Sequence, residues 1–214
     1  MTVKDYQTIY DIRESTDIDD LDKSAWAVCY VLGLKPEQVD SQPRKFARRM
    51  VKTERRINKA TIPMRFARAV NTDAERITFG QFVEVIEWLK FGDIEQMHMI
   101  YATLLNTGNH QHDAQRALKM NVRLVLPYVL EFITSFDNLL SRFKNLFEPP
   151  KQEDGGKPEP PHPFMQMYGW QYQAKVLAEY MGGNYTVNDA FNMNIIEALN
   201  TLALLKSKSD YDAR

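Results

Sequence analysis

The stretch EPPKQEDGGKPEPPHP, residues 148–163, decides how the chain is organised. It holds six of the ten prolines of the protein and the pair Gly155-Gly156. Proline removes backbone amide donors and disfavours helix in the residue before it, and paired glycines add backbone freedom. We therefore predict an exposed linker at 148–163, which separates a main domain at 1–147 from a small C-terminal module at 164–214.

The segment just before this linker carries the strongest helical pattern in the chain. Apolar residues recur at steps of three and four from Val129 to Phe147, and the stripe is wider than a single narrow seam. Such a stripe packs in the protein's own core, which is the commoner outcome, or against a partner. The residues that we assign to partner contact are Phe132, Phe136, Leu139, Phe143, Leu146 and Phe147.

Helix-start signals recur through the main domain. In a capping box, a Thr or Asp side chain and an acid or amide three residues later bond each other's backbone amides. We expect a helix after each such pair, and an apolar stripe follows each one. The pairs with this spacing are Thr2 with Asp5, Thr78 with Gln81 and Asp93 with Gln96.

Glycine and proline place further boundaries. A helix from about residue 19 should end at Gly33, a short turn can begin at Pro36, and Pro43 predicts a helix that ends near Asn58. A polar helix is expected from about Asp113. Residues 59–77 have weak helical periodicity, so a small β-hairpin is an alternative there. The fold class is therefore mainly α, with a multi-helical domain, a Pro/Gly-rich linker and a helical C-terminal module.

Composition is that of an ordinary soluble protein. The 27 basic and 28 acidic residues nearly cancel, which argues against a whole-domain nucleic-acid binder. Cys29 is the only cysteine, so no internal disulfide can form, and we expect a small buried thiol. The longest apolar run, Leu124 to Leu130, is far below the roughly 20 residues that span a bilayer, so we expect no membrane association.

Candidates for catalytic or metal chemistry are few. His110 and His112 form an HxH pair that we place in a polar loop, without a third ligand at metal-binding spacing. The acids from Asp17 to Asp22 lack the glycine and the glutamate of a calcium loop and suit the start of a helix instead. Phosphate-binding loops and nucleophile motifs are absent, so we expect no catalytic residue, no cofactor and no metal.

One strongly charged run stands out. From Arg44 to Lys59, eight basic residues accompany one acid, Glu54, which gives a local charge of +7. On a helix these cations would cover the outer surface, which could receive an acidic helix, a nucleic acid or the acids 17–22 of another copy. A solvated basic face without a specific partner is an equal alternative, and among partners a protein is favoured because the whole chain is balanced in charge. The basic residues assigned to partner contact are Arg44, Lys45, Arg48, Arg49, Lys52, Arg55 and Arg56.

The order of these patterned segments resembles proteins encoded among the tail or virion genes of tailed bacteriophages, especially those that infect Bacteroides-type hosts. Within that group the chain is similar to tail assembly chaperones. The likeness rests on patterned helices rather than on invariant chemical motifs. The segments that carry it are TVKDYQTIYDIRE, VLGLKPEQVDSQPRKF, ITFGQFVEVIEWLK, DIEQMHMIYATLL, VLEFITSFDNLLSRF, YGWQYQAKVLAEYMG and NMNIIEALNTLALLKSKSDYD.

This resemblance implies a non-catalytic function in phage assembly. Such chaperones coat the long helical tape-measure protein and help to recruit tail-tube subunits in the host cytoplasm. The implied partners are other phage structural proteins, namely tape measure, tail tube, portal or connector, and we also expect homo-oligomers. Two alternatives are a structural virion component at the portal, connector ring or capsid interior, and a nucleic-acid-binding or host-directed regulatory adaptor that acts through residues 44–59.

Overall fold

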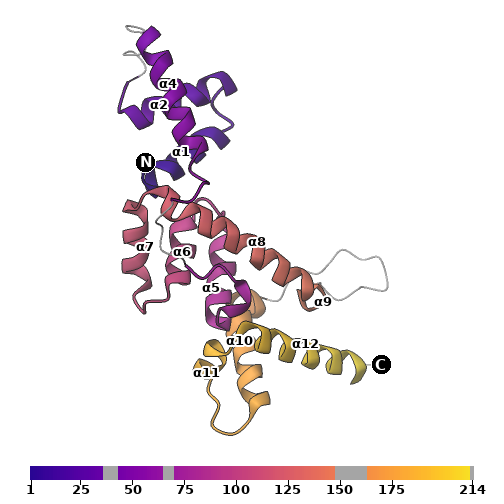
Figure 1. Ribbon diagram of the computed structural model, residues 1–214. Helices are drawn as coiled ribbons and strands as arrows, with labels where there is room; N and C mark the ends of the chain where they lie inside the picture. Colours follow the sequence, from indigo (N-terminus) through magenta and orange to yellow (C-terminus); the bar gives the residue numbers. More distant parts are fainter. Residues whose placement is uncertain (36–42, 65–69, 148–162, 213–214) are drawn as a thin grey trace, which may run out of the picture. The chain divides into compact units, whose positions relative to one another are not determined.

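The structure, a computed structural model, describes residues 1–35, 43–64, 70–147 and 163–212. Helices dominate this part of the chain, as the sequence predicted, and its only β-type pairings are two isolated bridges. The described residues of 59–77 form turns and a 3-10 helix rather than a hairpin. The turn expected at Pro36 and the linker at 148–162 lie outside the described residues. Figure 1 labels the helices in chain order.

The first of two compact units, unit 1, comprises residues 1–72 and 88–131. Helix α1 packs on α2 and α7, α2 packs on α4, and α6 lies beside α7 (Figure 1). Ile9, Ala27 and Ile57 are buried together where α1, α2 and α4 meet. The elements of unit 1 are α1 (Val3–Glu14), α2 (Asp20–Leu32), α4 (Pro43–Asn58), α6 (Met97–Leu105), α7 (His110–Lys119) and the 3-10 helix η2 (Val122–Leu124).

Local signals set the ends of several helices in unit 1. Thr2 and Asp5 form the predicted capping box at the start of α1. Gly33 adopts a left-handed φ of 61°, which suits the glycine expected after α2. Helix α4 begins at Pro43 and ends at Asn58, as predicted. Cys29 is buried, also as predicted, and desolvation raises the pKa of its thiol.

A backbone bridge fixes the start of α1, and no sequence pattern predicted it. The amide of Val3 donates to the carbonyl of Met120 over 3.0 Å, and the amide of Val122 donates to the carbonyl of Met1 over 3.2 Å. These two bonds form an isolated antiparallel bridge between Thr2 and Asn121. Segments more than one hundred residues apart are thereby joined at the N-terminus of α1.

Unit 2 comprises residues 73–87 and 132–214. Helices α5 and α8 each place residues in both units. The C-terminal helices are part of this unit, so the two units divide the chain differently from the predicted boundary at residue 147. The elements are η1 (Ala74–Arg76), α5 (Phe79–Leu89), α8 (Leu126–Arg142), α9 (Lys144–Phe147), α10 (Pro163–Met181), α11 (Val187–Asn192) and α12 (Ile195–Asp212).

An aromatic cluster forms the core of unit 2. Phe82 lies at its centre, with its ring centroid 5.3 Å from that of Phe136 and 5.7 Å from that of Trp170. Phe79 stacks on Phe191 of α11 at 5.8 Å. The cluster therefore draws rings from α5, α8, α10 and α11, and such pairs stabilise a fold beyond their buried area.

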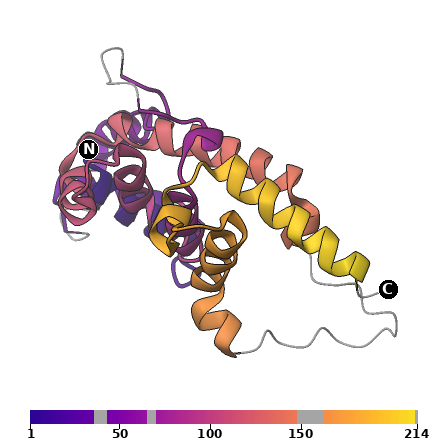
Figure 2. The ribbon, with the colours of Figure 1, turned by 90° about the horizontal axis from the view of Figure 1, so that it is seen from below.

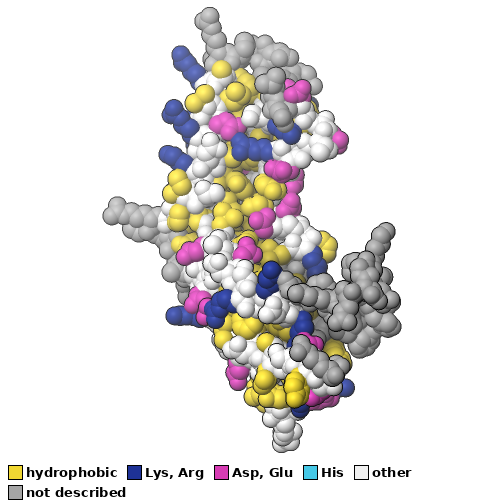
Figure 3. Space-filling model, turned by 90° about the vertical axis from the view of Figure 1, so that its right-hand side faces the viewer, with side chains coloured by type: hydrophobic (Ala, Val, Ile, Leu, Met, Phe, Trp, Pro, Cys, Tyr) yellow, Lys and Arg dark blue, Asp and Glu magenta, His cyan; other side chains and the backbone are white. Residues whose placement is uncertain are grey.

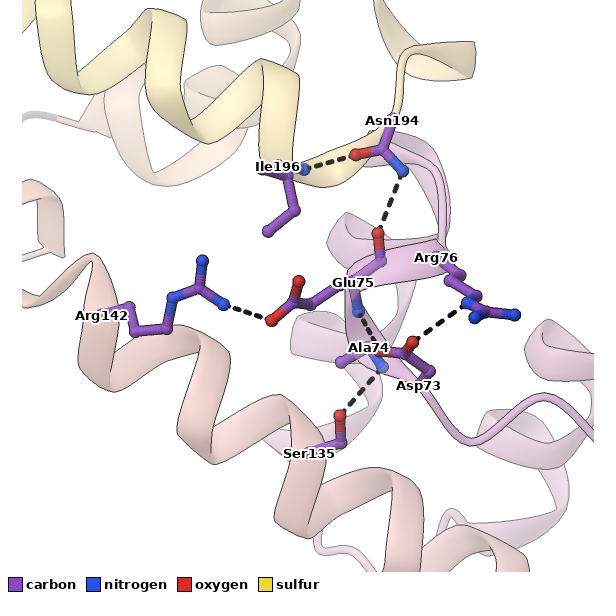
Figure 4. A network of polar contacts seen from close by, with 8 residues as sticks. All are labelled: Asp73, Ala74, Glu75, Arg76, Ser135, Arg142, Asn194 and Ile196. Atoms are coloured by element: carbon purple, nitrogen blue, oxygen red, sulfur yellow. Dashed lines mark hydrogen bonds and ion pairs between the residues drawn. The ribbon is translucent and has the colours of Figure 1, made fainter.

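Polar contacts attach the C-terminal helices to residues 73–76 (Figure 4). The side-chain amide of Asn194 donates to the carbonyl of Glu75 over 3.0 Å, and its oxygen accepts from the amide of Ile196. The carboxylate of Glu75 pairs with Arg142 of α8, and Ser135 accepts from the amide of Ala74. One short 3-10 helix thus holds α8 and α12.

A second isolated bridge lies beside this network. The amide of Phe79 donates to the carbonyl of Met193, and the amide of Ile195 donates to the carbonyl of Ile77. Thr78, between them, forms the predicted capping box with Gln81. Helix α12 then continues past α9, where Lys206 donates to the carbonyl of Asn145 (Figure 2).

Two predicted helix starts were wrong. Helix α6 begins at Met97 rather than near Asp93, and residues 93–96 form a turn in which the carbonyls of Ile94 and Glu95 accept from the side-chain amide of Gln7. Helix α7 begins at His110 rather than near Asp113, because Asn109 caps it through the amide of His112. The histidine pair therefore lies in a helix and not in a loop.

Candidate binding surface on helix α4

Helix α4 has a buried side and a strongly charged exposed side. Thr53 and Ile57 are both 3% exposed and face the helices of unit 1. The helix packs through this side because apolar burial drives association with α1 and α2. The exposed cations on the other side are called the basic face, and they are Arg48, Arg49, Lys52, Arg55, Arg56 and Lys59.

The single acid of α4 does not reach the basic face. Glu54 forms an ion pair with Arg13 of α1, with 2.6 Å between Nη2 and Oε2. Its other carboxylate oxygen is buried and has no hydrogen-bond partner among the described residues. No cation of the basic face forms an ion pair with another described residue. The outward charge of α4 is therefore entirely positive.

The surface along these cations is open and partly apolar. Val51 is 52% exposed and lies among Arg48, Lys52 and Arg55 in one shallow depression. A second depression, between the end of α4 and η2, is bordered by Arg56, Lys59 and Arg123. In Figure 3, dark blue Lys and Arg side chains project from the upper left edge, at the level of α4.

The basic face is suited to an extended anionic ligand. Arg48, Lys52, Arg55 and Lys59 follow one another at steps of four, three and four, so they form a single stripe about 16 Å long at 1.5 Å per residue. Guanidinium groups bind carboxylates and phosphates with paired hydrogen bonds. Cations this close repel one another, and an anionic partner relieves that repulsion.

The apolar residues assigned to partner contact do not form the exposed surface that this assignment requires. Phe132, Phe136 and Leu139 are core residues of unit 2, at 0%, 0% and 1% exposure, and the ring of Phe136 packs against that of Phe82 on α5. Their assignment to a partner is corrected accordingly. Phe143 and Leu146 are half-buried, and Phe147 is 39% exposed while its ring lies 6.2 Å from Phe82. The side chains of Arg44 and Lys45 lie outside the described part of the structure.

His98 and His110 belong to a separate polar cluster in unit 1. The ring of His110 stacks on Trp88 at 6.1 Å, and its Nε2 lies 3.0 Å from the hydroxyl of Thr103. His98 contacts the side-chain amide of Gln7 at 3.2 Å. Sequence reasoning missed this contact, since a glutamine on α1 carries no signal for it. Over the residues that the structure describes, no three His, Cys, Asp or Glu side chains are grouped as metal ligands.

We expect His98 to make unit 1 less stable in acid. Desolvation lowers the pKa of His98, the charge of His110 lowers it further, and a backbone hydrogen bond to Glu95 opposes both effects. The unfolded chain then binds the proton more readily than the folded protein does. Stability is full above the unfolded pKa of about 6.5 and falls as the pH drops below it.

Urea unfolding between pH 7.5 and pH 5 measures this effect. The free energy of unfolding should decline less steeply toward acid for His98→Gln than for the unmodified protein. Gln111→Ala is the control, because Gln111 is exposed on the same unit and does not titrate, so the slope should stay unchanged. Identical slopes for all three proteins would contradict the assignment to His98.

Within the described helices, none is both long enough and apolar enough to serve as a membrane span. Compared with protein-family models, with curated proteins and with solved structures, the chain has no match.

Proposed function

We propose that this chain is a non-catalytic bacteriophage assembly protein, an adaptor similar to tail assembly chaperones, that binds acidic polypeptides through the basic face of α4. The phage context rests on the resemblance of the patterned segments. The binding site rests on one observation in the structure, namely that the only acid of α4 is turned inward to Arg13 while the cations stay outside.

The spacing of the cations favours a helical partner. The stripe from Arg48 to Lys59 has the period of one helix face, so a second helix with carboxylates three and four residues apart can pair with it along its length. Val51 adds an apolar contact at the centre. A tape-measure protein, which is long and helical, offers this geometry.

Co-expression with the tape-measure protein of the same phage tests the proposal. The unmodified chain should be captured with it as a soluble complex. The variant R48E/K52E/R55E should bind about a hundredfold more weakly, because exposed pairs contribute about 0.5 kcal/mol each and reversal turns each attraction into a repulsion.

A matched variant separates the basic face from net charge. R116E/K119E/K208E reverses three exposed cations on α7 and α12 and should bind the tape-measure protein normally. Equal loss in both variants would mean that overall charge, not α4, determines binding. Failure of capture together with tight, salt-sensitive binding of a 30-base-pair DNA duplex would replace this proposal with the nucleic-acid alternative.

A further inference from the structure

Unit 1 carries an acidic surface as well as the basic face. It lies at the end of α1, the turn after it and the first turn of α2. Tyr10, on α1, marks how densely acids gather there: its pKa is raised, first by desolvation and then by the carboxylates of Glu14, Glu95 and Asp93. The exposed acids that define the acidic surface are Asp11, Glu14, Asp17, Asp19 and Asp22.

One ion pair makes the charge of both surfaces more uniform. Arg13 is the only cation in the sequence from Asp11 to Asp22, and Glu54 is the only acid from Arg44 to Lys59. These two residues form an ion pair at 2.6 Å, and both side chains are only partly exposed. What faces solvent is therefore a negative surface on one segment and a positive surface on the other.

Within one molecule, the described residues of the two surfaces form no ion pairs with each other. Across the described residues, no cation of the basic face pairs with a carboxylate of the acidic surface. Two complementary surfaces whose described residues form no ion pair with each other in one copy can pair between two copies.

We propose that the basic face of α4 binds the acidic surface of a second copy of this chain. The inference rests on the proposed function, in which the basic face is the binding surface, and names an acidic polypeptide that occupies it. The contact joins two different surfaces, so a pair of copies leaves one acidic surface and one basic face unoccupied, and further copies can add to form a ring or a filament. An acidic partner helix competes for the same face and dissociates the assembly.

Sedimentation velocity of the full chain tests this self-association. At 50 mM NaCl the protein should sediment as species larger than a dimer, and at 500 mM NaCl it should return to a monomer, because salt screens exposed charges. R48E/K52E/R55E and D11K/E14K/D17K should each be monomeric at low salt. R116E/K119E/K208E, with the same change in net charge as the first, should associate normally.

Mixing the two reversed variants gives the decisive result. The first variant loses the net positive charge of its basic face but keeps its acidic surface, and the second loses its net negative charge but keeps its basic face. An equimolar mixture should therefore form a heterodimer, through the one intact surface of each variant, that neither forms alone. A mixture that stays monomeric overturns the proposal, as does an unmodified chain that is monomeric at 50 mM NaCl. Large species that persist at 500 mM NaCl or in both reversed variants also overturn it.

The same variants separate this inference from the proposed function. D11K/E14K/D17K keeps the basic face but lacks the acidic surface. If it captures the tape-measure protein while the unmodified chain never self-associates, the proposed function stands and this inference fails. If the mixture of variants assembles while no variant captures the tape-measure protein, the inference stands and the proposed phage function fails.

Discussion

Replacing Phe82 with alanine is expected to lower the free energy of unfolding of unit 2 by about 3–5 kcal/mol. The side chain is fully buried, and its ring contacts those of Phe79, Phe136, Phe147 and Trp170. Truncation removes the transfer free energy of the ring and leaves a cavity that four helices must close. A loss of this size is a large fraction of the stability of an ordinary domain.

Hydrogen exchange with mass spectrometry, together with urea unfolding, measures this loss unit by unit. Peptides from α5, α8 and α10 should lose protection in Phe82→Ala. Phe91→Ala is the matched control, because Phe91 is 66% exposed in unit 1 and its removal should change stability by less than about 0.5 kcal/mol. If the two substitutions have equal effects, the aromatic cluster is not the core of unit 2.

The parts of the fold that sequence could predict depend on residues a few positions apart. The capping boxes at Thr2 and Thr78 and the stop at Gly33 are local, and all formed as expected. Thr186 likewise caps α11. Each cap uses a side chain and a backbone amide three residues away, and the stop uses the left-handed backbone that Gly33 itself allows, so the chain near the helix end contains the whole signal.

The errors arose where a distant residue altered a local signal. Asp93 and Gln96 have the spacing of a capping box, yet α6 begins at Met97, and the turn before it is bound by the side-chain amide of Gln7, about ninety residues away. Neither β bridge has a local signature, because each pairs segments more than one hundred residues apart. Asn109, by contrast, is a local cap for α7, because its side chain accepts a hydrogen bond from the amide of His112.

What covers an apolar stripe on a helix likewise depends on residues far away in the sequence. The pattern around Phe136 is the same whether the chain itself or a partner covers it. Here the chain itself covers it, because the ring of Phe136 lies 5.3 Å from that of Phe82 on α5 and its side chain is fully buried. The basic run was recognisable from composition alone, but the inward turn of Glu54 depends on Arg13, which lies 41 residues away in the sequence.

Removal of residues 163–214 is expected to unfold what remains of unit 2. The sequence suggested that 1–147 would stand as a domain, whereas the structure places Trp170, Phe191 and Leu199 in the same core unit as α5 and α8. Without them, Phe79 and Phe82 lose their covering partners. Each fully buried large apolar side chain contributes about 1.5–3 kcal/mol, so exposing several of them exceeds the stability that a small unit has.

Hydrogen exchange on the chain 1–147 should therefore show loss of protection at residues 73–87 and 132–147, and the protein should bind an apolar dye and aggregate. Deletion of 209–214 alone is the control, because the described residues at this end of α12 are exposed. Segments α1, α2 and α4 should keep their protection in both chains, since their shared core at Ile9, Ala27 and Ile57 lies wholly in unit 1.

Adding the separate segment 163–214 to the truncated chain distinguishes lost packing from a lost tether. The contacts of Trp170 and Phe191 with Phe79 need no covalent connection, so the segment added in trans should restore protection at 73–87. Binding in trans must overcome the entropy that the linker removes in the intact chain, so rescue should require a high concentration of the segment. A chain 1–147 that is protected throughout and soluble without this addition would show that α10–α12 are a dispensable module and that unit 2 is not held together by its aromatic core.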